Sequence, residues 1–537
     1  MVLPRVKKEV IKDGACRLPS SFGFKTDEHR DKISCLFPAF IEGITISEKE
    51  SDFVKFIKNS SFKSEEYLVK ISDKIEVYYK DYIGIRNALS LIANMINKDL
   101  TLPCGEFYDY PVFPYRGVMF DLARGVRDIN ILKEDILLCA KAKMNYIHLH
   151  FFDFPGSAIK IKSFPKEAYL PGAYSVDEVK ALIEYCDMLA LEVIPEFDLP
   201  AHSGKMIECF PEIACITDNP NQTKWTACAG SEKLFEIYDE IISELAGIFN
   251  SRYFHIGGDE IEFADRPELQ RLCHWDECKR CRAYMEKNNI NSRQELWYDL
   301  LIKVYHIVKK NGKTMIMWSD QLDCAREIPI PRDVIMQFWR VAGEGRGPHR
   351  DCSMNAQLKA GYKIINSHFP DTYVDLEQYI NSDKLKNWSP LESPESDGEY
   401  KENITGSELC AWEYGNRLKY SHYDWSLPSA IVLMGDKLWN GDSLPYSEEY
   451  SRSLTRTVLG QSTPEGFDIY PCFGDIIPPR TDERIYKDKI TIKKEEMDKA
   501  LSILLSMKGN FRADSYYDAI TKGISRSEEF EVNESLE

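Results

Sequence analysis

The amino-acid sequence predicts an α/β protein built on a (β/α)8 TIM barrel, preceded by a small α+β domain and followed by a helical C-terminal extension. Eight short apolar segments alternate with helical segments over most of the chain. These segments are apolar on both faces, as buried parallel strands are. No GxGxxG turn follows any of them, which disfavours the alternative of a doubly wound open sheet. We place the domains at 1–112, 113–440 and 441–537.

Size and charge narrow the class of protein. The chain has 537 residues and 43% hydrophobic content, enough for a large core and more than one domain. Lys and Arg number 68 against 86 Asp and Glu, and the net charge of −18 disfavours nucleic acid and anionic membranes as partners. The first residues contain no apolar signal-peptide core. We therefore expect a cytoplasmic protein whose 15 cysteines are reduced thiols, and the alternative is a secreted protein whose leader has been trimmed.

The N-terminal domain, residues 1–112, shows both strand and helix signals. Residues 67–71 and 75–79 alternate apolar and polar side chains around the polar turn 72–74, which predicts a hairpin. A helix should follow, because the next apolar side chains recur on one helical face. They are Ile85, Ala88, Leu89, Ile92 and Ile96.

The barrel, residues 113–440, should contain eight strands joined by helices such as 176–191 and 293–312. The second of these helices ends in basic residues and Gly312, a usual helix stop. The predicted strands are 115–123, 145–152, 192–198, 253–259, 314–320, 334–339, 362–369 and 407–413.

The C-terminal extension, residues 441–537, is rich in helix and loop signals. One apolar helical face stops before Gly509. Its members are Met497, Ala500, Leu501, Leu504 and Leu505.

Acids, histidines and large aromatic residues gather where the predicted strands end. The active site of a (β/α)8 barrel lies at the C-terminal ends of its strands. Aromatic faces stack on sugar rings and acids accept hydrogen bonds from hydroxyls, so this composition indicates a sugar site. The residues are His150, Asp153, Asp198, His202, Asp259, Glu260, Trp318, Trp339, Asp371, Tyr373, Asp375 and Trp412, while Arg116 opens the first strand and Arg124 follows it.

The order of these motifs resembles glycoside hydrolase family 20, the β-N-acetylhexosaminidases. The resemblance covers residues 60 to 440, with one motif per strand. The motifs are RG-x-M-x-D (116–121), HLH-x-x-D (148–153), VIPEFDLPAHS (193–203), HIGGDE (255–260), MWSD (317–320), QFW (337–339), YVD (373–375) and ELCAW (408–412).

The resemblance implies a mechanism that needs two adjacent carboxylates. Most retaining glycosidases hold an acid and a nucleophile about 5–5.5 Å apart, on opposite sides of the sugar. Neighbouring residues of one turn do not easily straddle the sugar in that way. In a substrate-assisted route the sugar's own 2-acetamido oxygen is the nucleophile. By resemblance, Glu260 is then the general acid/base, and Asp259 holds the acetamido group and stabilises the oxazolinium ion.

The resemblance also assigns roles to the other strand-end residues. Asp153 orients His202, which contacts the catalytic glutamate, while Asp198 is expected to be structural. The residues assigned to substrate are Arg116 for the sugar hydroxyls, Tyr373 for the acetamido oxygen, Asp375 for a ring hydroxyl, Trp318, Trp339 and Trp412 for the pocket walls, and His150 and Glu413.

The sequence departs from the family pattern at the rim of the predicted pocket. The family commonly has Glu two residues after the last tryptophan, where this chain has Tyr414, and the acid stands at Glu413. A segment that usually includes Trp and Arg is replaced by 154–156, Phe-Pro-Gly. The choice between gluco and galacto sugars therefore stays open. The basic insert 340–350 either meets an anionic substituent or a neighbouring subunit, or is a solvated loop, which is the favoured interpretation.

The run CHWDECKRC, residues 273–281, raises the question of a metal. Cys273, Cys278, Cys281 and His274 offer soft ligands of the kind that bind zinc. The usual second pair at longer separation is not evident, and the family's chemistry needs no metal. We therefore predict neither a metal nor a cofactor, and a structural metal on these cysteines stays the less favoured alternative.

The sequence thus predicts an exo-acting, retaining β-N-acetylhexosaminidase. Its partner is a carbohydrate with a terminal β-linked N-acetylhexosamine, GlcNAc or GalNAc. The second hypothesis is a non-catalytic amino-sugar-binding protein on a degraded barrel. The presence of both Asp259 and Glu260 argues against that alternative.

Overall fold

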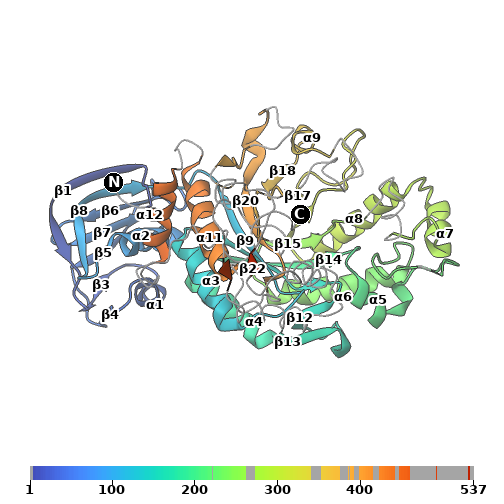
Figure 1. Cartoon of the computed structure of the whole chain (residues 1–537), viewed down its shortest axis with the longest axis horizontal. Coiled ribbons are helices and arrows are strands. Elements are labelled where there is room, and N and C mark those ends of the chain that lie inside the picture. The colour runs from blue at the N-terminus through green and yellow to red at the C-terminus, as the bar shows by residue number, and fades with distance from the viewer. Residues whose placement is uncertain are drawn as a thin grey trace. The chain divides into compact units, whose positions relative to one another are not determined.

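The computed structural model (Figure 1) divides the chain into two compact units. One comprises Met1–Asn416 with Leu427–Glu465, and the other Arg417–Ser426 with Gly466–Glu537. In the second unit the structure describes residues 423–426, the first residues of a helix, and the strand pair β21 (Thr491–Ile492) and β22 (Phe530–Glu531), so the helix predicted around Leu501 lies outside the described residues. The first unit is described over 4–414 and 427–459 except 221, 262–272, 340–351, 370, 375–384, 386, 392–397 and 442–446.

The N-terminal domain is a six-stranded sheet in the order β1-β8-β6-β7-β5-β3. The predicted hairpin is confirmed, since β6 and β7 pair antiparallel with Val69 opposite Val77. The predicted helix is α2, which begins where the Asp81 side chain accepts a hydrogen bond from the Gly84 N–H. The elements are β1 (Lys8–Arg17), β2 (Ser21–Phe22), β3 (Phe24–Lys25), α1 (Arg30–Phe40), β4 (Thr45–Ile46), β5 (Val54–Lys58), β6 (Tyr67–Ile71), β7 (Ile75–Tyr79), α2 (Tyr82–Met95) and β8 (Thr101–Asp109).

The predicted (β/α)8 barrel is confirmed. Eight parallel strands follow one another in chain order, and the pairing of β18 with β20 closes the sheet into a barrel. A short strand, β19 (Tyr373–Val374), lies against the upper part of β20. The barrel strands are β9 (Tyr115–Asp121), β10 (Tyr146–His150), β14 (Glu192–Leu199), β15 (Tyr253–Gly257), β16 (Thr314–Trp318), β17 (Ile335–Phe338), β18 (Lys363–Asn366) and β20 (Ile404–Ala411).

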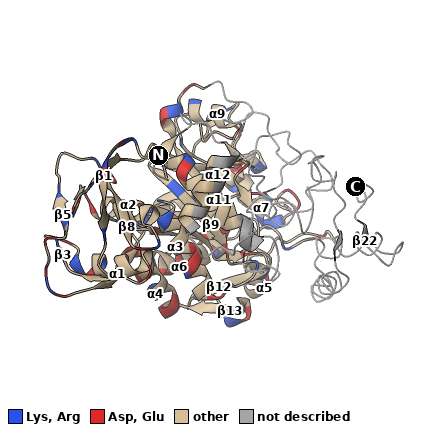
Figure 2. Ribbon diagram, turned by 60° about the vertical axis from the view of Figure 1, so that its left-hand side comes forward, with Lys and Arg blue, Asp and Glu red and all other residues tan. Residues whose placement is uncertain are grey.

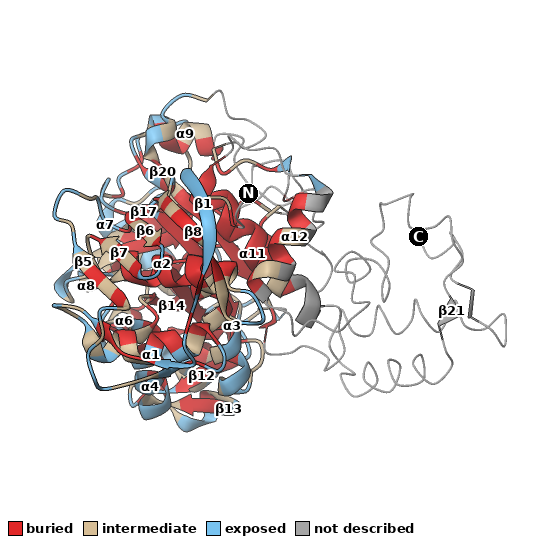
Figure 3. Cartoon of the chain, turned by 90° about the vertical axis from the view of Figure 1, so that its left-hand side faces the viewer, coloured by how far each residue is buried: buried red, intermediate tan, exposed pale blue. Residues whose placement is uncertain are grey.

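Helices surround the barrel, and local sequence explains where several of them begin. Ser175 and Glu178 form a reciprocal capping box at the start of α4. Figure 3 shows the buried strands at the centre and exposed residues on the outer helices and β1, and Figure 2 shows charged residues along outer elements such as α4 and α9. The helices are α3 (Ile129–Lys141), α4 (Val176–Met188), α5 (Gly204–Cys209), α6 (Glu232–Ile248), α7 (Lys279–Asn288), α8 (Arg293–Lys310), α9 (Met354–Lys359), α11 (Tyr423–Asn440) and α12 (Glu448–Leu459).

Shorter elements complete the first unit. After β10 the chain forms a separate three-stranded sheet in the order β11-β12-β13 before it enters α4. None of the described helices is both long enough and apolar enough to cross a membrane. The shorter elements are β11 (Phe152–Asp153), β12 (Gly156–Lys160), η1 (Lys166–Ala168), β13 (Tyr169–Ser175), η2 (Pro211–Ile213) and η4 (Lys401–Asn403).

The inside of the barrel is filled in layers, as in other barrels of this kind. A bottom layer at the strand starts is mainly apolar and includes Tyr115, Tyr146, Ile194, Ile316, Ile335 and Ile365. A middle layer is polar and buried, with His148, Glu196, His255, Gln337 and Glu408. Near the strand ends a further cluster contains Met119, Trp318, Tyr373 and Cys410. Buried side chains therefore fill the barrel beneath the residues at the strand ends.

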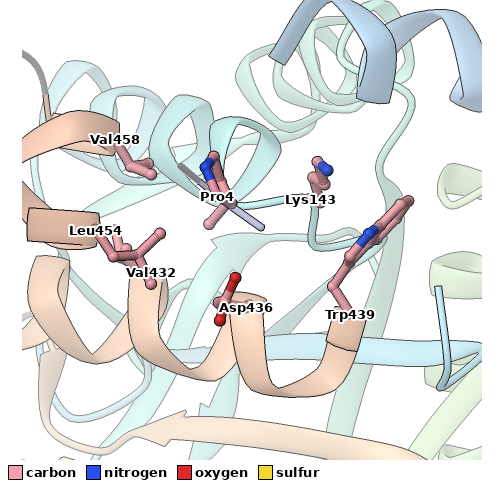
Figure 4. Close-up of a pocket in the computed structure, with 9 residues that line it drawn as sticks. Pro4, Lys143, Val432, Asp436, Trp439, Leu454 and Val458 are labelled. Carbon is pink, nitrogen blue, oxygen red and sulfur yellow. The ribbon is translucent and has the colours of Figure 1, made fainter. Parts of the chain in front are cut away.

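The N-terminal domain packs at the bottom of the barrel through buried charge. Asp109 at the end of β8 accepts hydrogen bonds from Lys143 Nζ at 2.8 Å, from Trp439 Nε1 at 2.8 Å and from the Tyr67 hydroxyl at 3.0 Å. Figure 4 shows Lys143 and Trp439 beside the small pocket that α11, α12 and Pro4 enclose at this end. This pocket therefore lies among groups that join the domain to the barrel.

Candidate active site

The turn after β15 presents the two adjacent acids. Gly257 and Gly258 adopt positive φ angles of 67° and 99°, which glycine adopts without steric cost. A Cβ on Gly257 would lie 1.8 Å from Asp198 Oδ1, so no side chain fits there. Asp259 is 7% exposed and the Glu260 side chain 22% exposed. The acid that sequence analysis assigned to the leaving group is thus the more accessible of the two.

His202 lies between this pair of acids and Asp153. Its Nε2 is 3.6 Å from Asp259 Oδ2 and 3.5 Å from Glu260 Oε2, which are ion-pair distances. Its Nδ1 is 3.2 Å from Asp153 Oδ1, within hydrogen-bond range. The structure therefore brings together all four residues that the sequence predicts as catalytic, from the ends of three neighbouring parts of the barrel.

The charge around His202 favours its protonated form. Burial alone would lower the pKa of His202, but the carboxylates of Asp153, Asp198 and Asp259 outweigh burial and raise that pKa well above its ordinary value. Burial would likewise raise the pKa of Asp153, but Arg124 and His202 hold it well below its ordinary range. An imidazolium at His202 therefore faces the carboxyl groups of Asp259 and Glu260 near neutral pH.

Asp259 is poised to exchange a proton near neutral pH. Burial is the main cause that raises its pKa to about 7, and the neighbouring carboxylates of Asp320 and Glu260 add to the shift, while His202 opposes it. Asp198 is expected from the sequence to be structural. One of its carboxylate oxygens lies within 4.8 Å of a ring nitrogen of His202 and a carboxylate oxygen of Asp259. Burial and the Asp259 charge raise the pKa of Asp198 well above its ordinary value. The site can therefore hold a carboxyl proton near neutral pH.

Arg124 is the site residue to which sequence reasoning gave no role. It follows β9, with NH1 3.0 Å from Asp121 Oδ2 and NH2 2.6 Å from Asp153 Oδ2. Its guanidinium lies over the Trp412 ring, 4.8 Å from the centroid, and its side chain is 22% exposed. The signal was present in the sequence, because Arg124 is the arginine that follows the strand end at Asp121, where barrel sites lie.

The substrate role predicted for Arg116 is wrong. Arg116 stands near the start of β9, at the bottom of the barrel, and its side chain is 0% exposed. Its Nε donates to the Lys143 carbonyl at 2.8 Å and its NH1 to the Phe113 carbonyl at 2.7 Å, while NH2 pairs with Glu65. Internal acceptors thus occupy the guanidinium, and it cannot reach a sugar at the other end of the strand.

The substrate role predicted for His150 is also wrong. The ring is fully buried, and carboxylates take both of its nitrogen atoms. Its Nδ1 lies 2.5 Å from Glu196 Oε2 and its Nε2 lies 3.0 Å from Asp153 Oδ2. His150 therefore orients Asp153 from behind rather than contacting a ligand.

Aromatic rings line the mouth beside the acids. Trp318 and Trp412 have ring centroids 5.8 Å apart, and Trp412 and Tyr373 are 6.2 Å apart. Tyr373 stacks on Trp339 with centroids 6.1 Å apart. Trp318 is almost fully buried and donates its Nε1–H to Glu196 Oε1 at 2.8 Å, whereas Trp339 and Trp412 are half-buried. The aromatic residues predicted for the pocket wall therefore pack together near the strand ends, and their contact with a sugar stays a prediction.

The two acids predicted for the rim have different outcomes. Asp375 lies outside the described residues. Glu413 is buried next to the strand end, and its N–H donates to Asp121 Oδ2 at 2.7 Å. Its negative charge acts on Arg124. Tyr414 points away, with its hydroxyl 2.5 Å from Asp135 Oδ2, so Glu413 is the acid at this strand end that faces the site arginine.

Buried ligand-type side chains also occur under the mouth. Within the described residues of the barrel, one group of such side chains consists of His148, Glu196 and His255. Two further groups share Asp198, which lies with His150 and Asp153 in one and with His202 and Asp259 in the other. Many of their atoms lie close to one another, since His255 Nδ1 is 2.9 Å from Glu196 Oε1 and His148 Nε2 is 3.1 Å from Glu196 Oε2. We interpret this network as a support that fixes the rotamers of the catalytic residues, and the absence of a catalytic metal stays a prediction.

Relatives in the sequence comparison are named beta-hexosaminidases. A Porphyromonas gingivalis protein is 28% identical over 294 residues, which are 49% of this chain and 36% of that protein. An Akkermansia muciniphila protein is 30% identical over 326 residues, 57% of this chain and 62% of that protein. Beta-hexosaminidase subunit A2 of Dictyostelium discoideum is 24% identical over 488 residues, covering 82% and 85%. The chain spans less than two thirds of the length of the two bacterial relatives.

Solved structures share the fold. An exo beta-N-acetylglucosaminidase of Vibrio harveyi, solved with N-acetylglucosamine, superposes with a TM-score of 0.72 at 20% identity, over 85% of this chain and 76% of that one. A beta-N-acetylhexosaminidase of Bacteroides fragilis gives 0.71 at 22% identity, over 86% and 95%. The model of the glycosyl hydrolase family 20 catalytic domain matches residues 113–421, the closed barrel and more than half of the chain. The chain therefore belongs to glycosyl hydrolase family 20.

Proposed function

We propose that the protein is an exo-acting β-N-acetylhexosaminidase that retains anomeric configuration through substrate-assisted catalysis. The observation that carries this proposal is the placement of Asp259 and Glu260, consecutive in one turn and both within 3.6 Å of His202 Nε2. Two consecutive carboxylates at one strand end suit a reaction in which the substrate supplies the nucleophile. They do not suit an acid and a carboxylate nucleophile on opposite faces of the sugar.

In the first step the acetamido oxygen attacks the anomeric carbon as the glycosidic bond breaks. Glu260 gives its proton to the leaving oxygen, and Asp259 accepts the acetamido N–H hydrogen bond while positive charge develops on the ring of the oxazolinium ion. In the second step Glu260 takes a proton from water, whose oxygen attacks the anomeric carbon and reopens the oxazoline. Two inversions at one carbon give net retention.

Charged and aromatic side chains at the barrel mouth support the proposal that a single terminal sugar binds there. Arg124 keeps part of its guanidinium exposed while Asp121 and Asp153 fix its direction. Trp412 offers the ring face against which it lies. A forked donor beside an aromatic face suits the hydroxyls and the ring of a terminal sugar, so we assign hydroxyl recognition to Arg124 with Glu413.

Comparison of matched substrates tests the proposal. A chromogenic β-glycoside of N-acetylglucosamine should be hydrolysed, and the matching β-glucoside with a 2-hydroxyl should be essentially inert. Positioned intramolecular attack contributes roughly 7–11 kcal/mol, which a modest change in the pocket cannot replace. A stable thiazoline analogue of the intermediate should inhibit because it resembles the high-energy species. Comparable rates on both sugars would exclude substrate assistance, and amino-sugar binding without hydrolysis would point to a binding protein.

The same assay also determines which terminal sugar is accepted. A panel of β-linked GlcNAc, GalNAc and GlcNAc sulfated at oxygen 6 reports whether Glu413 and Arg124 accept an equatorial or an axial 4-hydroxyl. It also reports whether the pocket accepts a substituent. Both questions concern the rim, where this chain departs from the family pattern at Tyr414.

A further inference from the structure

Four buried cysteines meet in one compact cluster away from the catalytic residues. They are Cys215, Cys228, Cys278 and Cys281, and their Sγ atoms all lie within 4.8 Å of one another. Cys228 Sγ is 3.5 Å from Cys278 Sγ and 3.5 Å from Cys281 Sγ. The first two cysteines come from the segment between β14 and α6, and the last two from the start of α7. The cluster therefore joins the two segments that follow neighbouring barrel strands.

The sequence indicated two of these four cysteines, Cys278 and Cys281, but grouped them with Cys273 and His274. Within the described residues Cys273 is not part of the group. His274 is held elsewhere, since its Nε2 accepts from the Thr223 N–H at 3.0 Å and its Nδ1 lies 3.2 Å from Glu277 Oε2. The second pair that appeared to be missing is Cys215 and Cys228, which precede the CxxC pair in the chain.

We propose that Cys215, Cys228, Cys278 and Cys281 bind one structural zinc ion as thiolates. Zinc in structural sites takes four ligands in a tetrahedron, with Zn–S bonds of about 2.3 Å and hence S···S edges of about 3.8 Å. The separations of 3.5 Å and the 4.8 Å limit of the group agree with that size. Binding releases the thiol protons to solvent, and with no water position left the ion has no open site for chemistry.

Other chemistry of four cysteines fits less well. A disulfide requires an S–S distance of about 2.05 Å, and the structure records all four cysteines as free. An iron–sulfur cluster places several atoms between its thiolates and holds them farther apart than one ion does. The Ile216 N–H points at Cys278 Sγ at 3.3 Å, the kind of outer hydrogen bond that stabilises a metal-bound thiolate. One tetrahedral ion is therefore the occupant that the geometry favours.

The zinc site fastens the segment that supports the catalytic turn. Trp225 lies three residues before Cys228, and its Nε1 donates to the Glu260 carbonyl at 3.3 Å. The Trp225 ring lies 4.4 Å from the His202 ring. Trp275 Nε1 donates to the Ala227 carbonyl at 2.8 Å, so both segments are also bonded beside the cluster. The four cysteines thus hold the segment whose Trp225 packs beside Glu260 and His202, and their ion is structural.

Metal analysis of the intact, full-length protein tests the proposal. Protein purified under reducing conditions without added metal should carry one zinc per chain by native mass spectrometry and elemental analysis. An organomercurial that titrates thiols should release that zinc into a chromogenic chelator. Replacement by cobalt should give the sulfur-to-metal charge-transfer absorption of a tetrahedral thiolate site. These readouts do not depend on activity, so they can fail while the proposed hydrolysis stands, and the reverse also holds.

Variants separate the cluster from its neighbours. Cys278→Ser should lower bound zinc well below one equivalent and lower the Tm, whereas Cys273→Ala, a buried cysteine of the same segment, should keep one equivalent. If Cys278→Ser does not fold, the zinc content and cobalt spectrum of the unaltered protein still decide. Protein that holds no metal and takes up none after reduction would overturn the proposal. Disulfides mapped among the four cysteines, or iron in place of zinc, would overturn it as well.

Discussion

Arg116 lies near the start of strand β9 and Arg124 lies just past its end, and the two arginines have different surroundings. Arg116, near the start, is fully buried, pairs with Glu65 and lies 5.1 Å from the Trp439 ring centroid. Arg124, just past the end, pairs with Asp121 and Asp153, lies over the Trp412 ring and stays partly exposed. Each has carboxylate partners and a tryptophan face, so local chemistry does not separate them.

The end of the barrel decides what each arginine can do. At the bottom the N-terminal domain covers Arg116, and its acceptors are backbone carbonyls and Glu65. At the mouth Arg124 lies over the half-buried Trp412 ring, and the carboxylates of Asp121 and Asp153 direct it. The bottom of a barrel serves stability and the mouth serves chemistry. Substitutions at the mouth should therefore change rates, and substitutions at the bottom should change unfolding.

The largest effect is expected at the mouth, from Glu260→Gln. Turnover of a disaccharide should fall roughly 10²–10⁴-fold because the amide cannot protonate the leaving oxygen. Aryl glycosides with an activated leaving group should lose less, since they need less protonation, and the Tm should hardly change. Steady-state kinetics on both substrates measure this difference. Hydrolysis of the disaccharide at near wild-type rate would remove Glu260 from the role of acid.

Arg116→Met should have the next largest effect, and on stability instead of rate. It leaves the Glu65 carboxylate buried without its cation, and breaking a buried pair in this way costs about 3–5 kcal/mol. Chemical denaturation measures the loss. The double variant Arg116→Met with Glu65→Gln should recover part of it, because no charge is then stranded. A change in KM at unchanged stability would instead return Arg116 to the substrate.

Asp259→Asn should stabilise the protein, but only at higher pH. The pKa of Asp259 is raised from 3.8 to about 7, mainly by burial. Its contribution to stability is full below pH 3.8 and is lost as pH rises through about 7, because the folded state alone keeps the proton between those values. The variant should therefore exceed the wild type by up to about 4 kcal/mol above pH 7 and match it near pH 4.

Denaturation midpoints at the two pH values check this sign. The matched control is Asp187→Asn, the same substitution at an exposed position of α4. If Asp259→Asn instead lost stability at high pH, a partner such as His202 would be stabilising the Asp259 carboxylate by more than burial destabilises it. Activity on the acetamido substrate should fall in the variant even where its stability rises, because the amide is a weaker acceptor for the N–H.

The smallest effect is expected from exchanging arginine for lysine at both ends of β9. Arg124→Lys keeps the charge but loses the fork, so kcat/KM should fall roughly 10–100-fold, about the value of one hydrogen bond to a charged group. Arg116→Lys should lower the Tm and leave the KM of the folded enzyme unchanged. The pair of variants, measured in the same assay, sharpens the contrast between the two ends. Equal changes in KM from both would break it.

The alternation along the chain was enough to predict the barrel and to place Asp259 and Glu260 at the end of one of its strands. Apolar strand segments and amphipathic helices carry their periodicity locally, so the eight strands appeared in order, and Asp259 and Glu260 were located at the end of β15. The hairpin β6–β7 was equally local, because a polar turn between two alternating segments pairs with its neighbour.

Contacts between distant segments were decided only by the tertiary structure. The sequence did not show that Glu65, 51 residues before Arg116, would cover the bottom of β9, or that two carboxylates would occupy both nitrogens of His150. It paired Cys278 with its nearest neighbours, whereas the folded chain brings Cys228, 50 residues away, to 3.5 Å. Periodicity records which face of an element is buried, but not which distant side chain meets it there, because that depends on how loops return across the barrel.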